Sequence, residues 1–412
     1  MLTKDKSAVI NNFGRYVSSG KMNFFKNFGL DFVPAKREGC FLYDMEGKKY
    51  LNCHCNGGVF NLGHRNKKII DATKNAFEYW DIGNHHLMSG PRAALGERLA
   101  ELMPGDINRT VFGVSGGEAI DLAIKLARGF TGRPGIISAR GGFHGHTGFA
   151  MAAGDEQFRA PFGPMAPGFS NVEFGDLKSL EQTIDENTAA VLFETIPATL
   201  GIQIPADEYF KGVKELCDKF GSLLIIDEVQ TGLGRTGKLW GIEHYFVEPD
   251  IIVIGKGLSG GIYPVSATCY SDKLDAFFQA NPFIHISTCG GSEVGCFTAL
   301  AVLEETAQSG FLGHVQEIAD LYAEKLHALQ EQFPKLLVEI RQKGLMMGLK
   351  FPHEKIALGI CKFMYDNGVF VVYSGNDTTV VQFLPPLIIN KSEAEFTIDA
   401  LSNSFTQIAE MM

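Results

Sequence analysis

The feature that most constrains the fold of this chain is an alternation of short apolar runs with helical patterns. Most of these runs are separated by stretches of helical periodicity such as EAIDLAIKLARGF. Strands that alternate with helices form mainly parallel sheets, and strands that are apolar throughout are typical of sheets buried on both faces. The sequence therefore predicts an α/β fold whose large domain holds a mainly parallel sheet flanked by helices. The expected strands are TVFGV (110–114), GIISA (135–139), AAVLFETI (189–196), LLIID (223–227), DIIVIG (250–255) and PVSATCY (264–270).

The pattern changes from Gly310 onward, where amphipathic helices alternate with less apolar strands. A chain of 412 residues exceeds the size of a single hydrophobic core, so a second domain is expected. Near the N-terminus, GCFLYDMEGKKYLNC predicts a hairpin with its turn at Asp44 to Lys48. We expect an N-terminal segment (1–55) that packs with the small domain, a large domain (56–309) and a small α+β domain (310–412).

The charge balance excludes several classes of partner. The chain has 37 Lys and Arg against 47 Asp and Glu, a net charge of −10, and no basic cluster. This argues against binding to nucleic acid or anionic membranes. The N-terminal stretch MLTKDKSAVINNFGRY mixes charges and amides, and no apolar run approaches the ~20 residues that span a bilayer. We expect a cytoplasmic protein.

The cysteines favour the same compartment. There are eight, without regular spacing, as is typical of reduced thiols. Cys53-His54-Cys55 resembles part of a metal site. Zinc sites, however, usually separate paired cysteines by about two to four residues and need a second ligand pair. We expect no bound metal.

Asp227 and Lys256 each follow one of the apolar runs, 29 residues apart (256 − 227 = 29). Singly, an Asp after a strand is usually a turn residue and a Lys there is usually solvated. Here both runs are expected to be buried parallel strands, whose carboxyl ends meet at the ligand-binding edge of the sheet. A lysine amine can form a Schiff base with a cofactor aldehyde, and a carboxylate can keep a pyridine nitrogen protonated. The pair therefore predicts a pyridoxal 5'-phosphate enzyme acting on amino groups.

A phosphate site is expected in VSGGEAIDLAIKLAR, which combines a strand, a glycine turn and a helix. Ser115, Gly116 and Gly117 would present free N–H groups at the positive end of the helix dipole. Most glycine turns before helices bind nothing, so the hypothesis depends on Asp227 and Lys256. Phe143 in GGFHGHT could stack on a pyridine ring, although a core aromatic is the simpler interpretation.

Together these motifs resemble the class III aminotransferases of the ornithine, 4-aminobutyrate and putrescine type. The resemblance runs from about Gly39 to Pro386 and is most specific in IDEVQTGLGRTGK and GKGLSGG. It implies the fold type I architecture and a homodimer with shared active sites. It also implies an aminotransferase that moves an amino group from an amine or amino acid to a keto acid or aldehyde.

The resemblance implies roles for individual residues. Lys256 would hold the cofactor and move a proton, and Asp227 would pair with the pyridine nitrogen. Val229 and Phe143 would sandwich the ring. Gln230 would reach its phenolic oxygen. The implied cofactor-binding residues are Ser115, Gly116, Gly117, Phe143, His144, Glu194, Asp227, Val229, Gln230, Lys256, Ser287 and Thr288. Of these, Thr288, helped by Ser287, would reach the phosphate in the neighbouring subunit.

Departures from the family pattern concern the substrate. Many members carry Thr or Ser at the position of Gly117, which lacks the hydroxyl. The family's carboxylate-handling network has a glutamate and two arginines, where this chain has Thr199, Gln382 and His146. An arginine forms bidentate, charge-assisted bonds that neither glutamine nor histidine reproduces. We therefore expect 2-oxoglutarate to be a poor acceptor.

Two other cations, Arg140 and Arg159, could bind a carboxylate from other directions, although a solvated surface charge is the simpler interpretation of each. Several other activities remain open on the same residues. An aminomutase or epimerase would need no external acceptor, and a decarboxylase or phospho-lyase would release carbon dioxide or phosphate. A non-catalytic carrier of the cofactor would form no aminated cofactor with any amine.

Overall fold

The computed structural model describes residues 5–83 and 86–411, and its largest unit is a seven-stranded sheet. Six of its seven strands run in the same direction, and β10 is antiparallel to both of its neighbours. The mainly parallel sheet expected from the sequence is thus confirmed. The order across the sheet is β4 (Ile107–Gly113), β10 (Ser266–Ser271), β9 (Ile251–Ile254), β8 (Leu223–Asp227), β7 (Thr188–Glu194), β5 (Gly135–Ala139) and β6 (Phe169–Val172).

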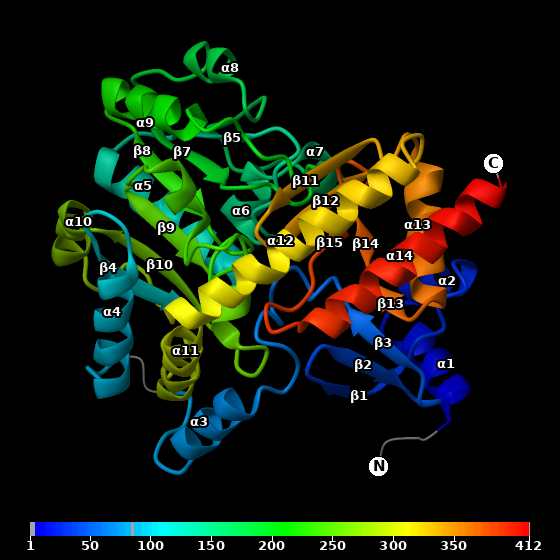
Figure 1. Ribbon diagram of the computed structural model, residues 1–412. Coiled ribbons are helices and arrows are strands. Elements are labelled where there is room, and N and C mark those ends of the chain that lie inside the picture. The colour runs from blue at the N-terminus through cyan, green and yellow to red at the C-terminus, as the bar shows by residue number, and fades with distance from the viewer. Residues whose placement is uncertain (1–4, 84–85, 412) are drawn as a thin grey trace.

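Helices cover both faces of this sheet (Figure 1). Successive strand residues point to opposite faces. On β8, Leu223 and Ile225 join the core beneath one group of helices, while Leu224 and Ile226 join the core beneath the other. The first group is α5 (Gly116–Thr131) and α6 (Gly148–Ala153), and the second is α3 (Lys67–Phe77), α4 (Gly90–Leu102), α9 (Tyr209–Phe220) and α11 (Glu293–Thr306).

Two four-stranded sheets lie to one side of the large sheet (Figure 1). The predicted hairpin is present, since β2 and β3 pair antiparallel. Strand β3 also pairs in parallel with β13, so the N-terminal segment and the C-terminal part share one sheet. The sheets are β1 (Pro34–Glu38), β2 (Phe41–Asp44), β3 (Lys49–Asn52) with β13 (Val369–Phe370), and β11 (Glu339–Lys343), β12 (Met346–Lys350), β15 (Val380–Phe383) with β14 (Val372–Tyr373).

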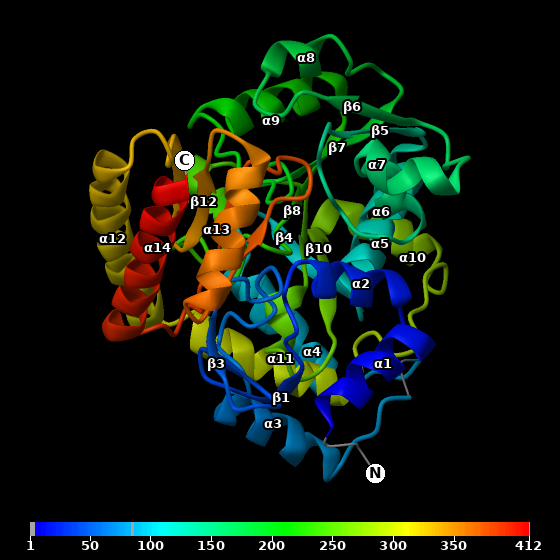
Figure 2. The ribbon, with the colours of Figure 1, turned by 90° about the vertical axis from the view of Figure 1, so that its right-hand side faces the viewer.

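Three long helices accompany these sheets at one edge of the molecule (Figure 2). Their apolar residues form one core with the small sheets, and that core also contains Leu51 and Cys53 from the N-terminal segment. Burial of this shared apolar surface holds the two ends of the chain together. The helices are α12 (Ser309–Gln332), α13 (Glu354–Asp366) and α14 (Lys391–Met411).

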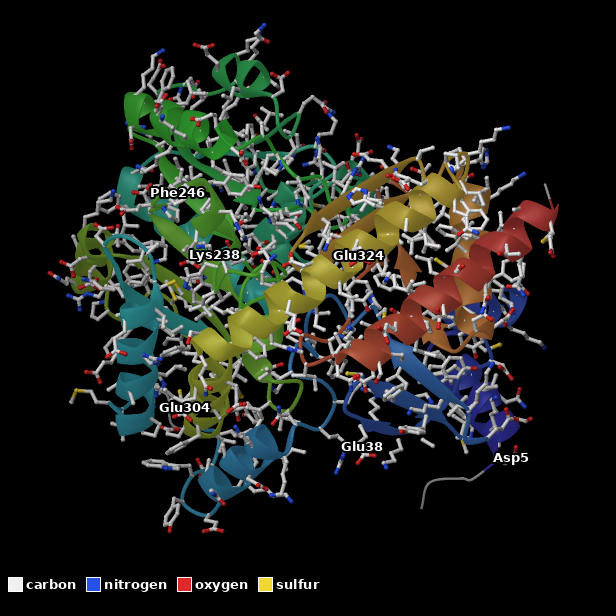
Figure 3. All side chains as sticks on the ribbon, in the orientation of Figure 1. Asp5, Glu38, Lys238, Phe246, Glu304 and Glu324 are labelled. Carbon is white, nitrogen blue, oxygen red and sulfur yellow. The ribbon has the colours of Figure 1, made fainter. Side chains whose placement is uncertain are left out.

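Short helices complete the chain, and charged residues such as Glu304 and Glu324 lie on its surface (Figure 3). Within the described residues, no helix combines the length and the apolar character needed to cross a membrane. The edge strand β6 and strand β12 were not predicted, because FSNV is short and half polar and MMGLK contains a glycine. The remaining elements are α1 (Lys6–Tyr16), α2 (Ser19–Asn27), α7 (Glu156–Arg159), α8 (Leu177–Glu181), α10 (Asp275–Ala280) and the 3-10 turns η1 (Ala160–Phe162), η2 (Gly241–Tyr245), η3 (Lys256–Ser259) and η4 (Asp272–Leu274).

Candidate active site

Two carboxylates lie side by side where strands β7 and β8 end. Glu194 and Asp227 are the last residues of these strands and are paired in register. Because side chains alternate along a strand, Asp227 points to the same face as Ile225, toward α5. Both carboxylates are buried, which is costly unless a proton or a cation offsets the charge.

His144 supplies the partner of Asp227. Its Nδ1 lies 2.9 Å from Asp227 Oδ2, and both side chains are buried. The other oxygen of Asp227 accepts a hydrogen bond from the N–H of Val229 at 3.0 Å. Burial acts to lower the pKa of His144, but its hydrogen bond to Asp227 and the charges of Asp227 and Glu194 raise it above its ordinary value. The protonated imidazole is therefore more favoured than in a free histidine, and it lies directly against the Asp227 carboxylate.

The pKa of Glu194 is set by a different combination of influences. It accepts a hydrogen bond from the N–H of Phe143 at 3.0 Å. Burial, together with the charge of Asp227, raises the pKa of Glu194 to about 7, although His144 acts in the opposite direction. A carboxyl group of this kind can change its protonation state near neutral pH.

We expect the variant Glu194→Gln to remove one contribution to the pH dependence of the free energy of unfolding. With its pKa raised in the folded state, Glu194 contributes stability that is fully present below its ordinary pKa of 4.5 and lost as the pH rises through about 7. Glutamine does not titrate, so the variant should gain on the wild type as the pH rises from 5 to 8, by up to about 1.4 kcal/mol per pH unit. Urea unfolding of the cofactor-free protein measures this. The exposed Glu186→Gln serves as control, and a difference that shrinks with rising pH would contradict the assignment.

Lys256 begins the turn η3 directly after β9 and Gly255. Its backbone φ is 37°, a left-handed conformation that is strained for a residue with a side chain. Burial lowers the pKa of Lys256 below its ordinary value, although the charges of Asp227 and Glu194 act in the opposite direction. A lowered pKa increases the fraction of neutral amine, which is the nucleophilic form.

The chain around Gly57 closes over the Lys256 amine. With its amide oriented to satisfy its neighbours, Gln230 accepts a hydrogen bond from Lys256 Nζ at 3.1 Å and donates to the Gly57 carbonyl at 3.3 Å. A Cβ built on Gly57 would lie 3.2 Å from Lys256 Nζ, and the φ of Gly57 is +66°. Only glycine fits this position without displacing the amine.

Sequence reasoning missed the positions beside this amine. The one available signal was the Gly57-Gly58 pair, because adjacent glycines often mark a close approach of the backbone. The sequence suggests only a metal-binding role for His54, as part of Cys53-His54-Cys55. In the structure, its buried Nδ1 has no partner among the described residues, and its ring packs edge-on against Phe370 of β13. Across the described chain, no three His, Cys, Asp or Glu side chains gather as a metal site.

The predicted glycine turn forms the start of α5. Ser115 is the N-cap, and its Oγ accepts from the N–H of Glu118 at 3.3 Å. The next two residues, Gly116 and Gly117, have N–H groups without an acceptor in the described part of the chain. A Cβ built on Gly116 would lie 3.2 Å from Val229 Cγ1, so the turn and the segment after Asp227 are in contact. Free N–H groups at a helix start provide an anion site.

The remaining predicted cofactor-binding residues are Phe143 and the pair Ser287 and Thr288. The ring of Phe143 packs against His146 and Phe158, with centroids 5.1 and 5.4 Å apart. Ser287 and Thr288 lie in the loop before α11, where Ser287 Oγ accepts from the N–H of Gly290 at 3.1 Å. Among the described residues, neither Ser287 nor Thr288 forms a hydrogen bond or an ion pair with Lys256 or Asp227.

These residues fit pyridoxal phosphate group by group. The half-buried Lys256 amine suits the aldehyde, the Asp227–His144 pair suits the pyridine nitrogen, and the free N–H groups of α5 suit the phosphate. The fold and this site define the class of pyridoxal-phosphate enzymes with the fold type I architecture.

Comparisons with known proteins identify the family. The model for "Aminotransferase class-III" matches residues 26–405. An uncharacterized aminotransferase of Archaeoglobus fulgidus is 55% identical over 401 residues, covering 97% of this chain and 94% of the relative. The putrescine aminotransferase of Pectobacterium atrosepticum is 33% identical, covering 95% and 88%. The chain belongs to the class III aminotransferase family and is a transaminase that uses pyridoxal phosphate.

A solved structure supports the same conclusion. A structure of the ornithine aminotransferase from Toxoplasma gondii, which has pyridoxal phosphate at partial occupancy in its active site, superimposes with a TM-score of 0.91 at 25% identity. The match covers 99% of this chain and 96% of that one. Both the predicted fold class and the predicted cofactor are confirmed.

Proposed function

We propose that this aminotransferase uses Lys256 and Asp227 as its catalytic residues and prefers an acceptor with one carboxylate or none. Bound pyridoxal phosphate supplies an electron sink for the substrate carbon that loses a proton. The Lys256 amine would hold the cofactor and carry that proton. Asp227, supported by His144, would keep the proton on the pyridine nitrogen.

The observation that carries the acceptor preference is the uncharged pair Thr199 and Gln382. The Thr199 hydroxyl donates to the Gly141 carbonyl at 3.2 Å, and Gln382 Nε2 donates to the Ala198 carbonyl at 3.1 Å. Both side chains therefore donate to backbone carbonyls, and the carbonyl that Gln382 contacts belongs to the residue before Thr199. The third position, His146, packs against aromatic rings. A second substrate carboxylate would lose its hydration there without a charge-assisted bond in return.

Arginines nearby are engaged elsewhere. Arg140 pairs with Glu173 at 2.6 Å on the surface, and Arg159 donates to the Ala152 carbonyl and to Asn171. Arg341 donates to the Gly201 carbonyl and pairs with Glu339. These contacts support the view that none of these three arginines replaces the missing network.

We expect pyruvate to outperform 2-oxoglutarate as acceptor by about tenfold or more, which is roughly 1.4 kcal/mol in transition-state terms. The enzyme is first converted to its aminated cofactor form with an amine, and stopped-flow absorbance then follows how fast each acceptor restores the original spectrum. The double variant Thr199→Glu/Gln382→Arg should raise the rate with 2-oxoglutarate, with Gln382→Leu as control. A tenfold preference of the wild type for 2-oxoglutarate would refute the proposal.

A second proposal concerns the amino donor and the reaction type. The putrescine aminotransferase relative supports a donor amine without a carboxylate, which needs no arginine to bind it. We therefore propose an alkyl amine or diamine as donor. Product analysis without an added acceptor separates this from an aminomutase or epimerase, and the absence of released carbon dioxide or phosphate separates it from a lyase.

We further propose a homodimer in which Thr288 and Ser287 reach the phosphate site of the partner. Phe283 and Ile284, which shortly precede this loop in the chain, are exposed apolar side chains, as is Met88, and they support a covered surface. We also propose a cytoplasmic location, supported by eight cysteines that are all free. The division into residues 1–55, 56–309 and 310–412 is likewise a proposal, supported by the pairing of β3 with β13.

A further inference from the structure

The hydroxyl group of Thr147 lies against the start of α5. A Cβ built on Gly117 would lie 2.9 Å from Thr147 Oγ1. On the other side of this contact, a Cβ built on Gly145 would lie 2.8 Å from the Cα of Gly117, and the φ of Gly145 is +127°. The two glycines therefore allow the loop of residues 143–147 to approach the helix more closely than other residues would.

No group in the described part of the chain uses this hydroxyl. Thr147 is the N-cap residue of α6, yet its side chain makes no capping hydrogen bond. Asp121 of α5 takes that role, since its Oδ1 accepts from the N–H of Ala150 at 2.7 Å. A threonine at an N-cap normally accepts from the helix. Here Thr147 is exposed, and its hydroxyl lies against Gly117, whose N–H group is free like that of Gly116. The hydroxyl is therefore available to a ligand at the start of α5.

We propose that the Thr147 hydroxyl binds the cofactor phosphate together with the N–H groups of Gly116 and Gly117, replacing the hydroxyl that many family members carry at position 117. The inference rests on the proposed phosphate-binding role of those two glycines. A Ser or Thr at position 117 would bring its Cβ against Thr147 Oγ1, so the site has room for one of the two hydroxyls. Hydrogen bonds to a phosphate are charge-assisted and hence stronger than neutral ones.

The test compares the binding of pyridoxal phosphate with that of pyridoxal, which lacks the phosphate, by equilibrium dialysis. Thr147→Val should weaken binding of pyridoxal phosphate by about tenfold, equivalent to about 1.4 kcal/mol, and leave that of pyridoxal unchanged. Thr147→Ser keeps the hydroxyl and should stay within about threefold of the wild type. Equal weakening of both ligands, or no weakening of either, would overturn the proposal.

The variant Gly116→Pro separates this inference from the phosphate site itself. Proline is tolerated at the first position of a helix and removes one N–H group. It should weaken the binding of pyridoxal phosphate more than that of pyridoxal, because any displacement of Val229 by the proline ring affects both ligands alike. If neither Gly116→Pro nor Thr147→Val discriminates between the ligands, the phosphate does not bind at α5. If only Gly116→Pro discriminates, the site stands and the role of Thr147 is refuted.

Moving the hydroxyl provides an independent check. Gly117→Ser alone should lower the melting temperature of the cofactor-free protein, because its Cβ meets Thr147 Oγ1. In the double variant Gly117→Ser/Thr147→Ala the contact is relieved and the hydroxyl returns from position 117. Pyridoxal phosphate binding within about threefold of the wild type supports the proposal. Binding as weak as that of Thr147→Ala alone overturns it.

Discussion

Alanine in place of Lys256 is expected to abolish turnover, by a factor of at least about 10⁴, since the proposed nucleophilic amine and proton carrier would both be lost. Cofactor binding should persist in weakened form, because the N–H groups of α5 and the Asp227–His144 pair are untouched. The absorbance of lysine-bound cofactor should disappear. Absorbance spectra and steady-state turnover with an amine donor measure these effects.

The matched control for Lys256→Ala is Lys238→Ala, which removes the charge of an exposed lysine at the surface (Figure 3). It should leave turnover and spectrum unchanged. Removing the Lys256 side chain also leaves space beside the Gly57 backbone, so melting temperatures of both variants establish that they are folded. Turnover of Lys256→Ala near the wild-type level would remove the central assignment of the site.

Asn in place of Asp227 is expected to lower turnover by roughly 10- to 10³-fold. An opposite charge within hydrogen-bond distance stabilises a protonated partner by about one to three pKa units, and each unit lost reduces the protonated fraction about tenfold. Asn keeps an oxygen for the N–H of Val229, so the local backbone can persist. The rate of amine half-reaction, measured by stopped flow at several pH values, should fall most at high pH.

Glu228 supplies the control for Asp227→Asn, because it is the adjacent residue and is also buried. Its carboxylate accepts from Thr195, Thr231 and the N–H groups of Gly241 and Ile242. Glu228→Gln should therefore lower the melting temperature but leave the pH profile of turnover unaltered. Equal effects of the two variants on that profile would mean that Asp227 has only a structural role.

Much of the large sheet could be predicted, because most of its strands are continuous apolar segments of the sequence. LLIID and DIIVIG are apolar throughout, and the structure makes them neighbouring parallel strands β8 and β9. Strand β12 could not be predicted in the same way, since MMGLK has neither a clear period nor strong strand propensity. Its place comes from pairing with β11 and β15.

Some residues of the candidate site could be predicted from local sequence patterns, and others could not. Asp227 and Lys256 could be named from sequence, because residues that follow parallel strands gather at one edge of the sheet. The contacts of His54, Gly57 and Thr147 could not, because each depends on a loop folding back onto a distant element.

By itself, the sequence of this protein determined the kind of sheet, the edge at which the candidate site lies, and the residue types present there, since these follow from local apolar patterns and from where strands end. Only the tertiary structure decided how the pKa values of Glu194 and His144 shift. It also decided that Thr199 and Gln382 are bound to backbone carbonyls and that Thr147 lies against Gly117. The physical reason is that burial, charge proximity and steric contact depend on distances between groups far apart along the chain, which no local pattern encodes.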